Sequence, residues 1–130
     1  MASRFSILLL LVFLSGCECD SICEANKRAK DFFSEEKSNS EIILFLTDYY
    51  GEGPGSETYS IFVKWGLKNQ QAFISVVNDP QLTKPVLHLI AYSISDIGLS
   101  DKYCEFYSSL PKGVEFKLKD LLLGCNSNTL

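Results

Sequence analysis

Apolar residues recur at helical spacing along most of the chain beyond residue 20, and this periodicity constrains the fold more than any other feature. Residues spaced by three or four positions form one apolar face per helix, with charged residues between them. Gly or Pro interrupts these runs, and both residues are typical of helix ends. We therefore expect an all-α fold, a small antiparallel bundle of about five to seven short helices stapled by disulfides.

Local signals give approximate helix boundaries. Ser38 and Glu41 offer a capping box, in which each side chain bonds to a free amide at the start of a helix. Thr83 can cap a later helix that has Pro85 in its first turn, where a missing amide costs nothing. The expected helices cover about 21–34, 38–50, 56–66, 69–77, 83–97 and 100–110.

Two segments need a separate interpretation. The glycine-rich stretch 51–55 is expected to be a loop, and a phosphate-binding role does not fit because no strand precedes it and no Lys follows Gly55. Residues 114–119 alternate like a strand, whereas Leu118, Leu121 and Leu122 recur like a helix. Because no partner strand is evident elsewhere, we predict a helix over 114–123.

The N-terminal residues have the order of a secretory signal. Arg4 precedes an unbroken apolar run, Ile7 to Leu14, and the small residues Ser15 and Gly16 follow it. As a helix this run would span only about 12 Å, less than half of the hydrocarbon core of a bilayer, so it cannot be a finished transmembrane anchor. We predict a signal peptide over residues 1–16 and a single helical domain over 17–130.

The end of this leader, Leu14-Ser15-Gly16-Cys17, resembles the lipobox of bacterial lipoproteins. The resemblance covers only these four positions and the preceding apolar run. It implies that cleavage occurs before Cys17, that Cys17 is lipidated, and that the lipid holds the mature chain on a membrane of the cell envelope, facing the periplasm or the cell exterior. The same residues also fit an ordinary cleavage site, which would release a soluble secreted protein beginning at Glu18.

Without Cys17 the chain has four cysteines, and this even number fits two disulfides in an exported protein. We expect long-range pairs, because a bond between the two N-terminal cysteines would close a very short loop and contribute little chain-entropy stabilisation. A metal site is not expected, because the spacing lacks a second close pair and His88 is the only histidine. The four candidates are Cys19, Cys23, Cys104 and Cys125.

The sequence offers no catalytic motif, and no cofactor is expected. His88 lies one position off an apolar stripe, which favours a surface or boundary position over a catalytic base. The whole chain has a net charge of −4, and loss of the leader removes Arg4 but no acidic residue, giving about −5. This charge argues against a nucleic-acid partner, which would require clustered Lys and Arg.

These observations favour a binding protein over an enzyme. Large aromatic side chains are enriched at protein interfaces, and the candidates for contact with a partner are Tyr49, Tyr50 and Trp65. The first functional hypothesis is a non-catalytic envelope lipoprotein that occludes a protein partner, as immunity proteins do, with a basic partner favoured by the acidic charge. The alternative is a helical carrier of a small apolar ligand, with aromatic and leucine side chains around a cavity.

Overall fold

The computed structural model describes residues 19–50, 57–122 and 125. Within these residues the fold is a small all-α bundle with two disulfides, as predicted. The predicted leader, Cys17, the loop 51–55 and residue 56, where a helix was predicted to start, lie outside the described residues. The elements are α2 (Ser21–Phe33), α3 (Asn39–Asp48), α4 (Thr58–Lys68), α5 (Gln70–Val77), α6 (Lys84–Asp96), α7 (Ser100–Ser108) and the 3-10 turn η1 (Lys119–Leu121).

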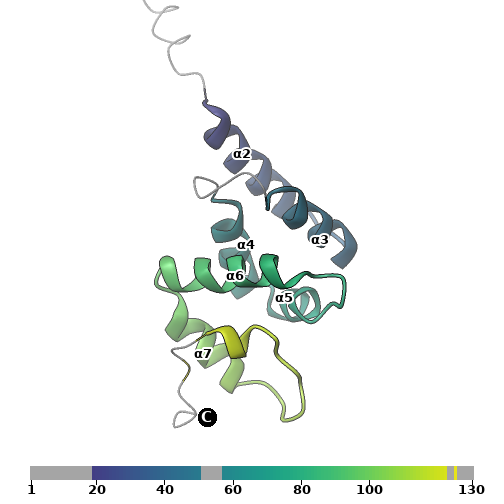
Figure 1. The fold of residues 1–130 in the computed structure, drawn as a ribbon, viewed down its shortest axis with the longest axis vertical. Coiled ribbons are helices and arrows are strands. Elements are labelled where there is room, and N and C mark those ends of the chain that lie inside the picture. The colour runs from purple at the N-terminus through teal and green to yellow at the C-terminus, as the bar shows by residue number, and fades with distance from the viewer. Residues whose placement is uncertain (1–18, 51–56, 123–124, 126–130) are drawn as a thin grey trace, which may run out of the picture.

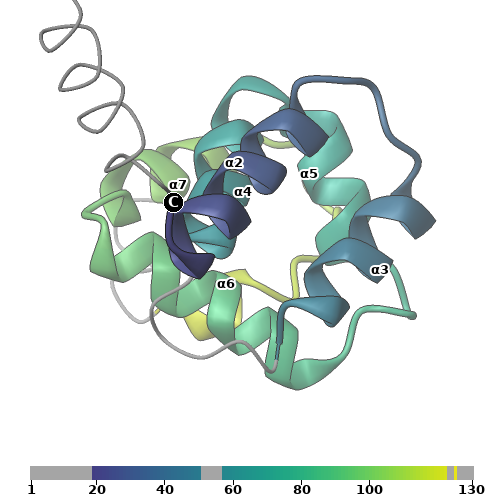
Figure 2. The same cartoon turned by 90° about the horizontal axis from the view of Figure 1, so that it is seen from above.

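Helix α4 lies in the middle of the bundle and contacts α2, α5 and α6 (Figure 1 and Figure 2). Its inner residues Tyr59, Phe62 and Val63 are buried at the predicted helical spacing. Gly66 belongs to the same inner stripe. A Cβ atom at Gly66 would lie 2.3 Å from the ring of Phe73, so glycine allows α5 to approach α4 closely. The opposite stripe of α4 is left for the surface.

The ends of α3 and α6 follow from local chemistry. The predicted capping box is present, because the Ser38 backbone N–H donates to Glu41 Oε2 at 2.7 Å and the Glu41 N–H donates to Ser38 Oγ at 3.3 Å. Thr83 does stand at the start of α6, but its side chain makes no capping bond. Helix α6 ends where Gly98 adopts a φ of +72°, a conformation that favours glycine.

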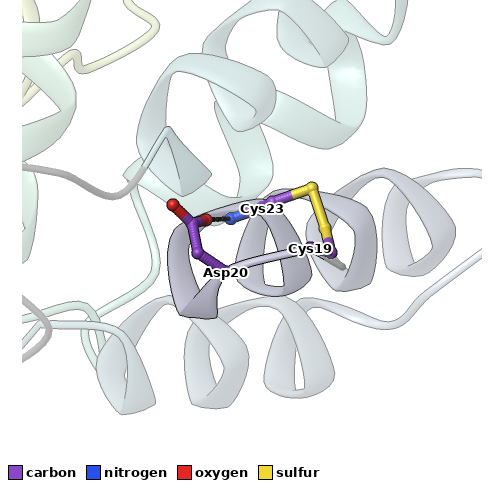
Figure 3. Close-up of a disulfide and its surroundings, with 3 residues drawn as sticks. All are labelled: Cys19, Asp20 and Cys23. Carbon is purple, nitrogen blue, oxygen red and sulfur yellow. Dashed lines mark hydrogen bonds between the residues drawn. A yellow bond between two sulfur atoms is a disulfide. The ribbon is translucent and has the colours of Figure 1, made fainter. Parts of the chain in front are cut away.

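The expected long-range disulfides are wrong: the bonds join Cys19 to Cys23 and Cys104 to Cys125, with Cα–Cα distances of 5.2 and 5.4 Å. The start of α2 and helix α7, which contains Cys104, lie at opposite ends of the molecule (Figure 1). A short bond is possible at the first end because α2 begins only at Ser21. Cys19 therefore lies just before the helix, and its side chain bonds to that of Cys23 in the first turn (Figure 3).

The predicted helix over 114–123 is also wrong. The described part of this segment has no α-helix, and η1 is its one regular turn. Val114 is 39% exposed, Phe116 is half-buried against the ring of Tyr107, and Leu118 is fully buried. Phe116 and Leu118 therefore both face the core two residues apart, a spacing that does not fit one face of an α-helix. The strand alternative is not borne out either, since the described part of this segment contains no strand and Val114 does not face the core.

Candidate partner-binding surface

The three aromatic residues predicted to contact a partner lie in three different environments. Tyr49 is only 6% exposed and packs on Phe45, with the two ring centroids 4.7 Å apart. The guanidinium of Arg28 covers its ring at 5.6 Å from the centroid. Tyr50, the next residue, is 50% exposed. Tyr49 is therefore mainly a core residue, while Tyr50 is available at the surface.

A groove of about 910 Å³ lies between α4 and α6, beside the end of α3. We call it the tyrosine groove, because four tyrosines from three elements line it. Of these, Tyr50 and Tyr92 are well exposed, and Tyr92 is the more exposed at 67%. The tyrosines are Tyr49, Tyr50, Tyr59 and Tyr92. Exposed tyrosines offer large contact area and a hydroxyl group at little conformational cost, so this groove suits binding of a polypeptide.

Two hydrogen bonds, one buried and one exposed, hold one side of the tyrosine groove in place. The Tyr59 hydroxyl donates to the backbone oxygen of Leu46 at 2.7 Å, which ties α4 to α3. Burial raises the pKa of Tyr59 to about 12, so this hydroxyl keeps its proton and remains a donor at neutral pH. At the start of α4 the Glu57 N–H donates to Asn26 Oδ1 at 3.1 Å, which ties α4 to α2. These two bonds thus hold α4 against α2 and α3 on one side of the groove.

Tyr92 was not predicted, although the sequence contains a signal for it. Val86, Leu87, Ile90 and Ile94 are buried along one side of α6. Tyr92 lies two residues from both Ile90 and Ile94, on the opposite side of the helix. A large aromatic residue on the polar face of an amphipathic helix does not pack into the core, so its position in the sequence could have identified Tyr92 as a surface residue for binding.

Trp65 lies in a second groove, of about 750 Å³, between the end of α2 and helices α4 and α5. It is half-buried, with its ring centroid 5.3 Å from that of Phe33 and 5.7 Å from that of Phe62. We call this the tryptophan groove. Lys30, Ile61 and Lys64 line both grooves. The structure therefore brings Tyr49 and Tyr50 to one groove and places Trp65 in its neighbour, on one surface that runs across α4.

His88, the residue considered as a catalytic base, is exposed on α6, and so are the carboxylates Glu35, Glu36, Glu115 and Asp120. Cys19, Cys23, Cys104 and Cys125 are all in disulfides, so none of these four has a free thiol. Within the described ranges, no group of three or more His, Cys, Asp or Glu residues is arranged to hold a metal ion.

No protein-family model, curated protein or solved structure matches this chain. In the part of the chain that the structure describes, none of the helices is both long and apolar enough to cross a bilayer. The two disulfides are typical of domains that fold outside the reducing cytoplasm.

Proposed function

We propose that the mature chain is a non-catalytic binding protein of the bacterial envelope, which is anchored by a lipid on Cys17 and occludes a protein partner. The observation that supports binding most directly is the pair Tyr50 and Tyr92, both well exposed in one groove. Tyrosine is enriched at the energetically important centres of protein interfaces. The hydrogen-bonded walls of this groove reduce the ordering cost of binding.

The anchor part of the proposal rests on the leader and on the distance from Cys17 to the folded domain. Helix α2 begins at Ser21, so only Glu18, Cys19 and Asp20 separate the lipidated residue from the first helix. A bound partner would therefore be held close to the membrane surface. More than one acyl chain on the mature N-terminus would make this attachment stable.

An inhibitor of the immunity-protein kind is one concrete form of this function. Such a protein needs a rigid surface and no reacting group, and it acts by covering the active surface of its partner. The net acidic charge of the chain would speed its encounter with a partner that is basic overall, more than it would strengthen the final complex.

Site-specific photo-cross-linking in a bacterial host tests the partner-binding part. A photoreactive amino acid replaces Tyr92, and the control replaces Leu44, which is 63% exposed on α3 and lies away from both grooves. We expect one protein to be cross-linked through position 92 and not through position 44. Equal labelling from both positions, or none from position 92, would contradict the proposal.

The anchor is tested by intact-mass analysis of the wild type and of Cys17→Ser from the same host. We expect acyl mass on a wild-type chain that begins at Cys17, and none on the variant. A soluble wild-type chain beginning at Glu18 would instead establish ordinary secretion. Native mass spectrometry of the same wild-type sample tests the carrier alternative, because a retained lipid-sized ligand would favour it over partner binding.

A further inference from the structure

The outward stripe of α4 combines apolar and cationic side chains. Ile61, Lys64, Trp65 and Lys68 follow one another at spacings of three, one and three residues, which places them on one face of the helix. All four line the tryptophan groove. This face is therefore apolar at its floor and positively charged at its rim.

A third groove, of about 760 Å³, continues this surface from α4 to α7. Leu67, Leu99 and Phe106 supply apolar lining, and Lys102 adds a cation from α7. Lys64 and Lys68 line both this groove and the tryptophan groove. We call the two together the lysine face. Lys64 and Lys68 thus lie on the ridge between two apolar hollows.

The local charge of the lysine face is opposite to that of the whole chain. Five lysines and three glutamates line its two grooves, which gives a net charge of +2 on a chain whose net charge is −4. In the described residues the one ion pair is Lys37–Glu35, at 3.3 Å. The cations Lys30, Lys64, Lys68 and Lys102 consequently have no carboxylate partner there. Charge complementarity then favours an anionic ligand.

We propose that the partner presents an acidic polypeptide segment that lies across α4 on the lysine face. Its carboxylates pair with Lys64 and Lys68, and an apolar side chain of the same segment packs beside Trp65, against Phe33 and Ala72. This inference rests on the proposed function, since it names the chemistry of the protein that is bound. A partner that is basic overall can still present such a segment, because the total charge governs long-range approach and local charge governs docking.

A polypeptide fits this face better than the two other polyanions that it could meet. A nucleic-acid backbone carries a phosphate at every nucleotide, so some phosphates would lie beside Glu35, Glu36 or Glu105 and be repelled, whereas a polypeptide can place its carboxylates at the lysines alone. An anionic bilayer presents a broad surface, which would leave the two apolar hollows unfilled. A segment with both carboxylates and apolar side chains complements the lysines and the hollows together.

Trp65 makes the test specific, because it is the only tryptophan in the chain. The full chain, reconstituted into phosphatidylcholine vesicles, is titrated with a short synthetic peptide of glutamate and leucine while tryptophan fluorescence is recorded. We expect a saturable change that weakens as the salt concentration rises, because exposed charge pairs are screened. A peptide with lysine in place of glutamate should produce no saturable change.

Charge-reversal variants locate the binding. We expect Lys64→Glu/Lys68→Glu to weaken acidic-peptide binding at least about tenfold, through loss of two pairs and added repulsion, and Lys64→Gln/Lys68→Gln to weaken it less. The control Lys84→Glu/Lys117→Glu changes the total charge equally at exposed lysines away from these grooves, and it should bind within about twofold of the wild type. Circular dichroism verifies that every variant retains its helical content.

Three results would overturn the acidic-segment proposal. One is the absence of saturable acidic-peptide binding by the wild type. Another is wild-type affinity in Lys64→Glu/Lys68→Glu. The third is a fluorescence response to single-stranded DNA, or to phosphatidylglycerol added to the vesicles, without a response to the acidic peptide. If cross-linking through position 92 still identifies one partner, the proposed function stands and only this inference fails.

Discussion

The two disulfides lie at opposite ends of the fold. One spans the first turn of a helix, and the other ties down a segment with little regular secondary structure. Cys19–Cys23 closes a loop across the first turn of α2, where Asp20 Oδ1 already accepts the Cys23 N–H at 2.8 Å (Figure 3). Cys104–Cys125 joins α7 to a segment whose one regular turn, among the described residues, is η1. The first bond reinforces a structure that a helix cap also holds. The second holds a segment that has little backbone structure of its own.

This difference indicates what each end depends on. Exposed Ile22 and the exposed Cys23 leave the first turn of α2 with few core contacts, so its order comes from local bonds. At the other end, Leu118 and Leu122 belong to the main hydrophobic core, and Cys125 packs against it. The C-terminal segment should therefore be coupled to global unfolding, and the start of α2 should open separately.

The largest expected effect comes from emptying the core beneath the C-terminal segment. Leu118 is fully buried, so Leu118→Ala removes apolar contacts and leaves a cavity. We expect it to lower the free energy of unfolding by about 2 to 5 kcal/mol. The matched variant at the other end, Ile22→Ala, is at a 47% exposed position and should cost much less. Urea unfolding followed by circular dichroism measures both, and equal losses would show that the two ends do not differ as argued.

The next largest effect should follow removal of the C-terminal disulfide. Its cysteines are 21 residues apart, and the chain-entropy model gives at most about 3 kcal/mol for a loop of that length. We expect Cys104→Ser/Cys125→Ser to approach this loss in urea unfolding, because the unfolded chain gains freedom. Hydrogen exchange should also rise along 114–122. Unchanged exchange there would mean that Leu118 and Leu122 hold the segment without the covalent bond.

Removal of the N-terminal disulfide should have a smaller, local effect. Its cysteines are four residues apart, and the same model gives an upper limit of about 2 kcal/mol. Since the first turn of α2 can fray before the core unfolds, we expect Cys19→Ser/Cys23→Ser to lower the global free energy of unfolding by less than about 1 kcal/mol. Hydrogen exchange should increase at the start of α2 alone. A larger global loss than in Cys104→Ser/Cys125→Ser would reverse the comparison.

The helices could be predicted because their signals are local. The capping box of α3 and the buried stripe of α6 each use residues within one or two turns, and both are present as expected. The disulfide pairing could not be predicted in the same way, because it depends on which parts of the bundle lie side by side. The start of α2 was predicted correctly, and it leaves Cys19 outside the helix within reach of Cys23. The long-range pairs were expected from chain entropy alone, which does not determine which cysteines lie together. The prediction for 114–122 was wrong for a related reason. The conformation of this segment is set by how Leu118 and Leu122 pack into a core formed by other helices.

The candidate surface was only partly accessible to sequence reasoning. Composition identified Tyr49, Tyr50 and Trp65 as large aromatic residues, but helical spacing could not say that Tyr49 turns inward beneath Arg28 while Tyr50 stays exposed. The tyrosine groove forms because α2 and α6 both pack on α4, which brings Lys30 and Tyr92 to the same surface. Long-range packing of this kind leaves no periodic mark in a single sequence.

The smallest expected effect concerns α3, which begins with a cap and no disulfide and so serves as a reference for the start of α2. Hydrogen bonds from the backbone N–H and hydroxyl of Ser38 hold the pKa of Glu41 below its ordinary value of 4.5. Because the folded state lowers this pKa, the ionised side chain stabilises the protein above about pH 4.5, and that contribution is lost as the pH falls through the folded-state pKa. Glu41→Gln should therefore show a slightly smaller loss of stability on acidification than the wild type. Urea unfolding of both proteins across this pH range measures the difference, and hydrogen exchange should place it at the start of α3. If hydrogen exchange on acidification instead rises first at the start of α2, the Cys19–Cys23 disulfide does not make that helix start more stable than the capped start of α3.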